Sequence, residues 1–251
     1  MKSLEQCHAF VTGGASGIGL AITRAFAAAG ARVTIASRNI DRVNAVAAEI
    51  EEVSGVALDV SDPDNIASVF DVAGPIDILV NNSGMAIAAP FHKVTLAAWS
   101  EVMAVNLTGV FLCTQAALTS MRERDSGRII NIASTAGLKG YAYIAPYAAS
   151  KHGVIGMTRS LALELALTGI TANCVCPGFT DTPMADDAVA NITEKTGRSE
   201  AEGLAELTKH NPQQRLIAPE EVADTVLWLC QDSSRSINGQ AIGVAGGEIT
   251  Q

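Results

Sequence analysis

Short apolar runs alternate along the chain with longer stretches in which apolar residues recur every three or four positions. The short runs are rich in Val, Ile and Ala, which is typical of strands buried on both faces. They predict strands at residues 8–12, 31–36, 55–60, 76–81, 127–134, 170–176 and 240–246. The longer stretches predict helices at residues 18–30, 39–52, 95–123 and 146–168, with another after the third strand. This alternation predicts an α/β fold, in which helices cover both faces of a parallel sheet.

Residues 184–215 interrupt the alternation with a polar, mainly helical stretch between the sixth strand and the final helix. An insertion of this length inside a compact domain usually has a function, for example as a lid over a substrate site. Decoration of the surface is an equally good interpretation. We therefore expect one domain over residues 1–251, with the lid as a hypothesis about the insertion.

Composition and charge exclude several kinds of partner. Of the 251 residues, 48% are hydrophobic and 17% charged, so the chain can bury one large core. Its 17 Lys and Arg are outnumbered by 26 Asp and Glu, which gives a net charge of −9 and argues against nucleic acid or an anionic membrane. The opening "MKSLEQCHAF" lacks the long apolar segment of a signal peptide, and no stretch is typical of a membrane span. We expect a cytoplasmic protein.

The five cysteines also fit a cytoplasmic protein. They are scattered through apolar segments, and their odd number fits reduced thiols. Cys174 and Cys176 would face the same side of a strand, which makes a metal pair conceivable. No further Cys or His follows at ligand spacing, so we expect no metal.

The sequence "VTGGASGIG" joins the first predicted strand to the first predicted helix. Its glycines, Gly13, Gly14, Gly17 and Gly19, allow unusual backbone angles and the close approach of a pyrophosphate. The helix that follows directs its N-terminus at that group. The spacing differs from the G-x-G-x-x-G fingerprint, but its position between a strand and a helix favours a dinucleotide site.

The end of the second predicted strand bears on which dinucleotide binds. An acidic residue at this point would hold the hydroxyls of the adenosine ribose, whereas this chain has Ser37 and Arg38, with no carboxylate before Asp41. Ser can hydrogen-bond a 2′-phosphate and Arg can pair with it. An Arg in a solvated loop is the alternative. The pattern favours NADP(H), and NAD(H) stays compatible.

Tyr147 and Lys151 lie four residues apart in "APYAASKHGVIG", so on a helix they share a face. A nearby ammonium favours the ionised phenol and would lower the pKa of Tyr147, which makes a proton donor and acceptor. A half-exposed Tyr beside a solvated Lys is the alternative for such a pair taken alone.

Several distant motifs occur together with this pair. They are T-G-x-x-x-G-x-G from Thr12 to Gly19, "NNSG" at 81–84, Asn106 in "VNLTG", Ser134, Y-x-x-x-K from Tyr147, and P-G-x-x-x-T from Pro177 to Thr182. Their order and spacing resemble the short-chain dehydrogenase/reductase family across the whole chain, above all its 3-oxoacyl thioester reductases and polyketide ketoreductases. The resemblance implies a Rossmann-type, doubly wound sheet of seven parallel strands in the order 3-2-1-4-5-6-7, and a homotetramer.

The resemblance also implies four catalytic residues: Asn106, Ser134, Tyr147 and Lys151. Tyr147 would be the general acid in ketone reduction and the general base in alcohol oxidation. Ser134 would hold the substrate carbonyl, and Lys151 would lower the pKa of Tyr147 and bind the nicotinamide ribose. Asn106 would support a water that leads from Lys151 to solvent, unless its amide bonds to the backbone.

The family places the adenine at Asp59 and Val60, the adenosine-side ribose at 82–84, and the carboxamide of the nicotinamide at Thr182. Asp59 could instead cap the end of its strand. The full set of expected cofactor contacts is Thr12, Gly13, Gly14, Ser16, Gly17, Ile18, Gly19, Ser37, Arg38, Asp59, Val60, Asn82, Ser83, Gly84, Tyr147, Lys151, Pro177, Gly178, Thr180 and Thr182.

Two positions depart from the family pattern. Ser83 stands in "NNSG" where Ala is usual, a small change that we expect the site to tolerate. Ala245 stands in "GVAGG" where Asp is usual, which leaves its effect on local capping or subunit contacts open.

The residues expected to line the substrate pocket are apolar or aromatic, without an Arg for a free carboxylate. They are Met85, Ile87, Leu138, Tyr141, Tyr143, Phe179 and Met184. This lining suits a hydrophobic ketone or a 3-oxoacyl thioester on coenzyme A or a carrier protein. Within the insertion, Lys195, Arg198 and Lys209 could contact a carrier phosphate, or could belong to a solvated helix face.

We therefore expect NADPH-dependent reduction of a ketone or 3-oxoacyl thioester to the secondary alcohol. The alternative is an NAD-dependent 3-hydroxyacyl-thioester or secondary-alcohol dehydrogenase that works in the oxidative direction. A sensor that has lost catalysis is disfavoured, because Ser134, Tyr147 and Lys151 are all present.

Overall fold

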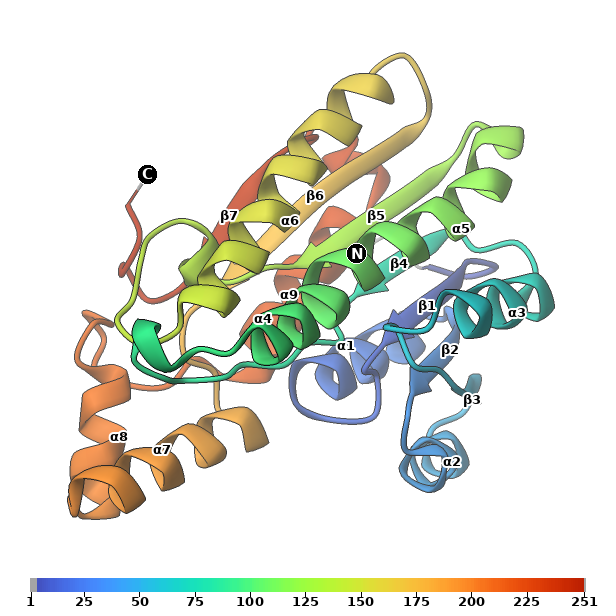
Figure 1. The fold of residues 1–251 in the computed structure, drawn as a ribbon. Coiled ribbons are helices and arrows are strands. Elements are labelled where there is room, and N and C mark those ends of the chain that lie inside the picture. Colours follow the sequence, from blue (N-terminus) through green and yellow to red (C-terminus); the bar gives the residue numbers. More distant parts are fainter. Residues whose placement is uncertain (1–3, 251) are drawn as a thin grey trace.

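The apolar runs pair in the order β3-β2-β1-β4-β5-β6-β7 in the computed structural model, which describes residues 4–250 (Figure 1). All neighbouring strands run parallel. The strands are β1 (His8–Thr12), β2 (Arg32–Ser37), β3 (Val53–Ala57), β4 (Ile78–Asn81), β5 (Gly127–Ile132), β6 (Ile170–Pro177) and β7 (Ala241–Val244). The predicted fold class and strand order are confirmed.

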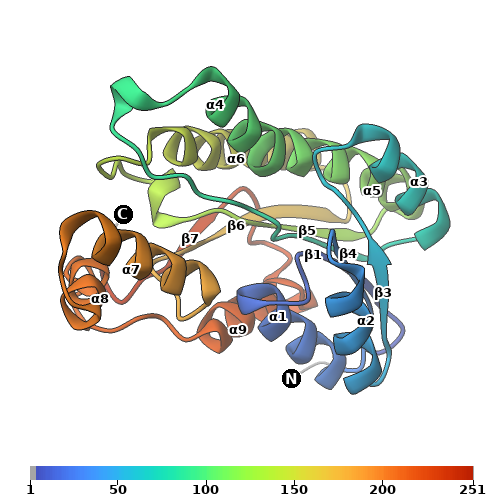
Figure 2. The same ribbon diagram turned by 60° about the horizontal axis from the view of Figure 1, so that its bottom comes forward.

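Helices cover both faces of the sheet, as Figure 2 shows from its edge. One layer holds α1 (Gly17–Ala28), α2 (Ile40–Glu49) and α9 (Pro219–Leu229). The opposite layer holds α3 (Pro63–Ala73), α4 (Leu96–Met103), α5 (Gly109–Arg124) and α6 (Ala145–Glu164). Neighbouring strand residues point to opposite faces: Val11 joins the core under α1 and α9, whereas Phe10 joins the core under α3 and α5.

Polar side chains start three of these helices. Asn39 accepts a hydrogen bond from the Arg42 amide at the start of α2. Asp62 accepts bonds from two amides at the start of α3, where Pro63 fits because the first helical turn needs no amide hydrogen from it. Thr95 caps α4 in the same way. These local signals place the helices close to their predicted ranges.

The third strand differs from the prediction, because it ends at Ala57 instead of continuing to residue 60. The Asp59 carboxylate accepts hydrogen bonds from the amide and hydroxyl of Ser61, which turns the chain out of the sheet. Leu58 and Val60 still enter the core, so their apolar character reflects burial beyond the strand.

The predicted helix at 95–123 consists of α4 and α5, joined by a π-helical turn at Ala104–Thr108. The combined segment Leu96–Arg124 contains an 18-residue window with a mean hydropathy of 1.5 and is long enough to cross a membrane. Its residues Cys113, Ala117 and Met121 are buried against the sheet, so this segment packs as a core helix.

Residues 184–215 contain the two helices α7 (Pro183–Thr196) and α8 (Glu200–Thr208), as their pattern predicted. They lie outside the two layers, beyond the carboxyl ends of β6 and β7 (Figure 1). Ala185, Val189 and Leu207 form a small core between them, and Phe179 packs against it.

Candidate active site

Parallel strands end on the same side, so the residues that follow β1, β4, β5 and β6 meet at one edge of the sheet. Four of the predicted motifs lie there: the glycine-rich turn, "NNSG", Ser134 and the P-G segment that begins at Pro177. The tertiary fold thus brings together segments that are far apart in the sequence.

Packing explains two of the glycines in the turn after β1. Gly13 has a φ of +67°, and a Cβ there would lie 2.8 Å from Asn82 Nδ2. A Cβ on Gly19 would lie 2.1 Å from the Gly13 carbonyl oxygen, so no larger residue fits without moving the backbone. Within residues 4–250, the Ser16 side chain makes no capping bond to α1. The amides at the start of α1 can therefore bind a phosphate.

Thr12 and Asn82 tie this turn to the end of β4. Thr12 Oγ1 accepts hydrogen bonds from the amides of Asn82 and Ser83, both at 3.0 Å. Asn82 Nδ2 donates to the carbonyls of Thr12 and Gly13 at 3.0 and 3.3 Å. The Asn82 side chain, which we expected beside the ribose, thus holds the glycine-rich turn.

Ser37, Arg38 and Asp59 lie at the corner formed by the ends of β2 and β3. Ser37 Oγ accepts from the Asn39 amide at 3.1 Å, and Arg38 is exposed. Hydrogen bonds from Ser61 hold the pKa of Asp59 below its ordinary value, and the charge of Arg38 acts in the same direction. The Val60 side chain is buried in the core, so a contact to adenine would come from its main chain.

The catalytic residues predicted from the sequence converge on the other side of the glycine-rich turn. Ser134 follows β5, and its hydroxyl hydrogen-bonds the Tyr147 phenol. Lys151 is buried one turn further along α6, where its Nζ donates to the Ile132 carbonyl at 2.8 Å. Its Nζ lies 5.6 Å from the centroid of the Tyr147 ring. Tyr147 and Lys151 share a helix face, as predicted.

The electrostatics of this pair differ from the expectation. Burial raises the pKa of Tyr147, and the group that counteracts the rise is Ser134 through its hydrogen bond, not Lys151. Burial also lowers the pKa of Lys151 from its ordinary 10.5 to about 8. Sequence spacing predicted that the two side chains would be neighbours, but their desolvation depends on the surrounding fold.

Both polar atoms of the Asn106 side-chain amide hydrogen-bond to the main chain of Met85. Its Oδ1 accepts from the Met85 amide at 2.9 Å, and its Nδ2 donates to the Met85 carbonyl at 2.8 Å and to Ser150 Oγ at 3.2 Å. A Cβ on Gly84 would lie 3.4 Å from Asn106 Oδ1 and 3.7 Å from Lys151 Nζ. Asn106 therefore fixes the segment after β4 beside Lys151, while its role in a water relay stays a prediction.

The segment that follows β6 completes the site. Thr180 is buried, and its hydroxyl donates to the Gly178 carbonyl at 3.0 Å. Thr182 precedes α7, and a Cβ on Gly17 would lie 3.0 Å from Thr182 Cγ2. The P-G-x-x-x-T motif thus contacts the glycine-rich turn directly.

Comparison with known proteins agrees with this geometry. The family model for short chain dehydrogenases matches residues 7–193. The chain belongs to this family.

Three proteins illustrate the similarity. A protein named as a ketoacyl reductase of the granaticin polyketide synthase from Streptomyces violaceoruber is 42% identical over 249 residues, 95% of this chain and 92% of its own. Acetoacetyl-CoA reductase from Rhizobium meliloti is 41% identical and covers 96% of this chain and 97% of its own. A crystal structure of a point variant of actinorhodin polyketide ketoreductase with NADPH matches with a TM-score of 0.94, at 38% identity and 99% coverage of both chains.

Within this short-chain dehydrogenase fold, most residues expected in the substrate pocket lie at the same sheet edge. Met85 and Ile87 follow β4, and both are partly exposed. Phe179 follows β6 and meets the Tyr141 ring edge-on, with 6.5 Å between the centroids. Met184 is the second residue of α7 and is 46% exposed.

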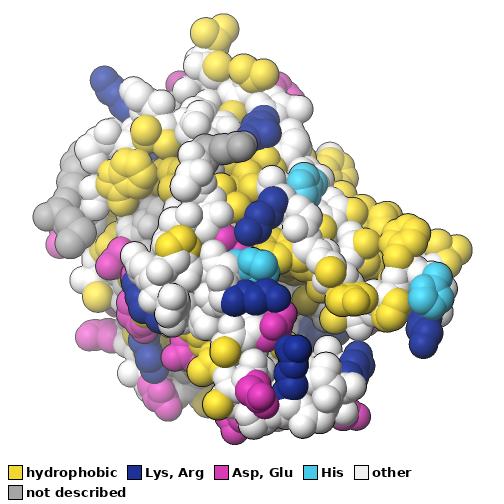
Figure 3. Space-filling view, turned by 90° about the vertical axis from the view of Figure 1, so that its left-hand side faces the viewer, with side chains coloured by type: hydrophobic (Ala, Val, Ile, Leu, Met, Phe, Trp, Pro, Cys, Tyr) yellow, Lys and Arg dark blue, Asp and Glu magenta, His cyan; other side chains and the backbone are white. Residues whose placement is uncertain are grey.

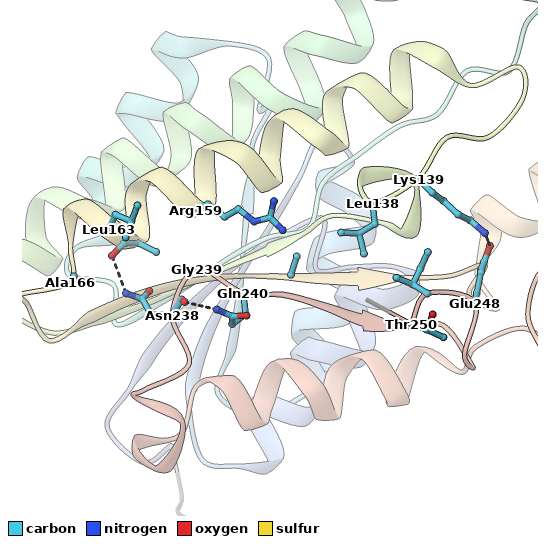
Figure 4. Close-up of a pocket in the computed structure, with 13 residues that line it drawn as sticks. Leu138, Lys139, Arg159, Leu163, Ala166, Asn238, Gly239, Gln240, Glu248 and Thr250 are labelled. Atoms are coloured by element: carbon cyan, nitrogen blue, oxygen red, sulfur yellow. Dashed lines mark hydrogen bonds and ion pairs between the residues drawn. The ribbon is translucent and has the colours of Figure 1, made fainter.

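Two of the expected pocket residues lie apart from these. Leu138 follows the 3₁₀ turn at Thr135–Gly137 and, with Lys139 and Glu248, lines a groove of about 730 Å³ between α6 and β7, as Figure 4 shows. Tyr143 is 65% exposed and has a φ of +70°, and its carbonyl accepts a hydrogen bond from Ala89. Its ring therefore belongs to the rim of the site at most.

The basic residues of the insertion are largely engaged with an acid. Arg198 lies 3.3 Å from Glu206, and Lys209 forms an ion pair with the same carboxylate. This arrangement favours the solvated helix face over a phosphate site. Figure 3 shows the side of the molecule on which α7, α8 and the C-terminus lie, where charges of both signs are interspersed with hydrophobic side chains.

The cysteines of β6 lie close to Lys151, and among residues 4–250 they belong to no cluster of three or more possible metal ligands. Cys174 Sγ lies 3.1 Å from Thr158 Oγ1. Burial raises the pKa of Cys174 to about 11 and that of Cys176 to about 12, so both thiols stay protonated at neutral pH. They act as core residues.

Sequence reasoning missed one element of the site, the buried carboxylate of Glu248. It accepts a hydrogen bond from the Tyr141 phenol and lies 2.9 Å from Lys139 Nζ. The sequence separates Glu248 from Tyr141 by 107 positions and contains no motif that links them. The nearest signal in the sequence was Ala245, which stands where the family pattern usually has Asp.

Proposed function

We propose that the protein is an NADPH-dependent reductase that converts a 3-oxoacyl thioester or related ketone to the secondary alcohol. The observation that carries this proposal is the convergence of Ser134, Tyr147 and Lys151 beside Gly84 and the glycine-rich turn. The acetoacetyl-CoA reductase and the ketoreductase with NADPH, to which the chain is similar along nearly its whole length, support the same reaction.

The residues of the turn and its neighbours fit a dinucleotide with a 2′-phosphate. Gly13 and Gly19 have no side chain, so a pyrophosphate can approach the backbone closely. The start of α1 offers amides to the same group. Arg38 is exposed at the end of β2, where its guanidinium would pair with the 2′-phosphate, and the Asp59 carboxylate accepts a hydrogen bond from Ser61. When bound, NADPH supplies the hydride that is added to the carbonyl carbon.

Ser134 and Tyr147 act together on the substrate oxygen. Because their hydroxyls are hydrogen-bonded to each other, both can turn to the same carbonyl oxygen. The raised pKa keeps the Tyr147 phenol protonated until the oxygen gains negative charge and takes its proton. Lys151, whose pKa of about 8 leaves it mostly charged at neutral pH, stabilises the resulting phenolate. Reduction thus consumes one hydride and one proton.

The pocket residues favour an apolar acyl group. Met85, from the segment after β4, and Phe179 and Met184, from the segment after β6, would surround the approach to Ser134, and methionines adapt to varied shapes. We infer that α7 and α8 act as a lid over this group, because their small core also holds Phe179. Thr182, which contacts Gly17, would bind the carboxamide of the nicotinamide.

We further propose a homotetramer in the cytoplasm. Leu96 is 80% exposed on α4, and Trp99 and Phe111 are exposed on the same helical segment, which suits burial by another copy. The five free cysteines fit a reducing compartment. Sedimentation of the purified protein tests the assembly.

A substrate panel tests the reaction. Wild-type protein is assayed for NADPH consumption with acetoacetyl-CoA, with longer 3-oxoacyl thioesters of N-acetylcysteamine, and with small charged keto acids. We expect turnover of the thioesters, with kcat/KM rising as the acyl group becomes more apolar. A preference for charged keto acids, or for NADH, would contradict the proposal.

A further inference from the structure

A buried carboxylate connects the C-terminal segment to the loop after β5. The Glu248 side chain is 2% exposed, and its Oε1 accepts a hydrogen bond from the Tyr141 phenol and lies 2.9 Å from Lys139 Nζ. Figure 4 shows Lys139 and Glu248 meeting beyond the ends of the strands. A carboxylate so far from water is unfavourable unless it is paired. Lys139 and Tyr141 supply the pairing from one short loop.

The direction of the hydrogen bonds follows from the chemistry of the groups. An ionised carboxylate can only accept, so the single phenolic hydrogen of Tyr141 goes to Glu248. The Thr135 hydroxyl, 2.7 Å from the phenol oxygen, then donates to Tyr141. Thr135 is buried and directly follows Ser134. A hydrogen-bonded chain therefore runs from Glu248 to the neighbour of the substrate-binding serine.

The ring of Tyr141 also contacts the insertion. It meets Phe179 edge-on at 6.5 Å and His210 edge-on at 6.0 Å, and Lys139 Nζ lies 4.8 Å from its centroid. Phe179 packs on the small core of α7 and α8, and His210 follows α8. Tyr141 is thus the point at which the loop after β5, the insertion and the C-terminal segment meet.

The backbone of the C-terminal segment is shaped to place this carboxylate. A Cβ on Gly178 would lie 3.3 Å from Glu248 Oε2, and one on Gly246, whose φ is +60°, would lie 2.0 Å from Asn211 Oδ1. Asn211 itself is buried and bonds to the Arg215 carbonyl at 2.7 Å. The turn before Glu248 is therefore packed tightly on the segment that returns from α8.

We propose that Glu248 is a positioning residue for the acyl group of the substrate, which acts by fixing the Tyr141 ring as a wall of the pocket. This inference rests on the proposed reductase function. Without the carboxylate, the phenol keeps only the Thr135 hydroxyl as a hydrogen-bond partner and the ring can turn away from Phe179, so longer acyl groups bind less tightly. The proton transfer by Tyr147 and the binding of NADPH do not depend on this contact.

Three single variants, and a double variant that combines Glu248→Ala with Tyr141→Phe, test the inference. Glu248→Ala removes the carboxylate, Tyr141→Phe removes the phenol but keeps the ring, and Glu248→Gln keeps a neutral acceptor of the same size. For each we would measure KM and kcat with a short and a long 3-oxoacyl N-acetylcysteamine thioester, and the Kd for NADPH by fluorescence. Glu194→Gln, an exposed acid on α7, is the matched control.

We expect Glu248→Ala and Tyr141→Phe each to raise KM for the long substrate by about tenfold, the scale of one charge-assisted hydrogen bond. The values of kcat and of the NADPH Kd should stay within about twofold. The double variant should be no worse than either single variant, because both remove the same bond. Glu248→Gln should recover most of the loss, and Glu194→Gln should resemble wild type.

The inference would be overturned if the KM increases of the two single variants multiplied in the double variant. It would also be overturned if KM rose equally for short and long substrates. If Glu248→Ala fails to fold, Tyr141→Phe tests the inference by itself, because it removes only the hydroxyl and keeps the packed ring. A wild-type protein that turns over none of the thioesters would contradict the proposed function itself, which separates that failure from a failure of the positioning role.

Discussion

The cofactor side of the site and the substrate side are built by different means. On the cofactor side, formed by Thr12 to Gly19 with Asn82, a Cβ would meet the Asn82 side chain at Gly13 and the Gly13 carbonyl at Gly19. On the substrate side, formed by Tyr141, Phe179 and Glu248, side chains from three distant segments meet.

This difference determines how each side tolerates change. Close backbone packing demands particular residues at fixed spacing, which is why the cofactor side carries motifs. Contacts between side chains can be made by many residue pairs, so the substrate side can vary and thereby set specificity.

A large effect on NADPH binding should come from breaking the cofactor side at Gly19. Gly19→Ala places a Cβ 2.1 Å from the Gly13 carbonyl, so the turn must move. Overpacking costs about 1–3 kcal/mol, and we expect the Kd for NADPH to rise by about tenfold to hundredfold. Gly156→Ala, at an exposed position of α6 with open space around the Cβ, is the control and should leave the Kd unchanged. Equal Kd values for the two variants would refute the packing argument.

Arg38→Ala should weaken NADPH binding by about 1–3 kcal/mol, because it removes the exposed guanidinium that we propose to pair with the 2′-phosphate. NADH, which lacks that phosphate, should bind nearly as before. Ser37→Asp should reverse the preference, since a carboxylate repels the phosphate and can hold the ribose hydroxyls. Titration of both nucleotides checks this, and a wild type that already prefers NADH by about tenfold would contradict it.

The pH dependence of reduction tests Lys151. Burial lowers its pKa to about 8, so Lys151 is charged below that pH and neutral above it. The pKa of Tyr147 is raised, so its phenol stays protonated through this range. We expect kcat to be constant at lower pH and to fall above pH 8, by about tenfold per pH unit at the limit. Lys151→Arg cannot titrate there, so a similar fall near pH 8 in that variant would assign the transition to another group.

The smallest effect is expected at the basic residues of the insertion. Arg198 and Lys209 both pair with Glu206 on an exposed surface, and such pairs contribute about 0–1 kcal/mol. Arg198→Ala should therefore leave KM for acetoacetyl-CoA within about twofold. A rise of tenfold or more would restore the interpretation of this face as a phosphate site.

The cofactor side could be located from the sequence because its constraints are local, while the individual contacts to the cofactor stay predictions. Glycines that precede a helix, and a Ser-Arg pair after a strand, indicate chemistry without knowledge of the fold. The sequence also placed Ser134, Tyr147 and Lys151, since their motif identifies the family. It did not identify Glu248, whose partner Tyr141 lies 107 positions away. The pKa values of Tyr147 and Lys151 depend on burial, which spacing does not reveal.

The central claim is that Tyr147 donates the proton in a reduction that uses NADPH. The most direct test is Tyr147→Phe, in which turnover of the best 3-oxoacyl thioester and the Kd for NADPH are measured on the same preparation. We predict that kcat falls by about two orders of magnitude or more, the usual scale of positioned acid–base catalysis, while the Kd stays within about threefold. Near-normal turnover in Tyr147→Phe would contradict the mechanism proposed here.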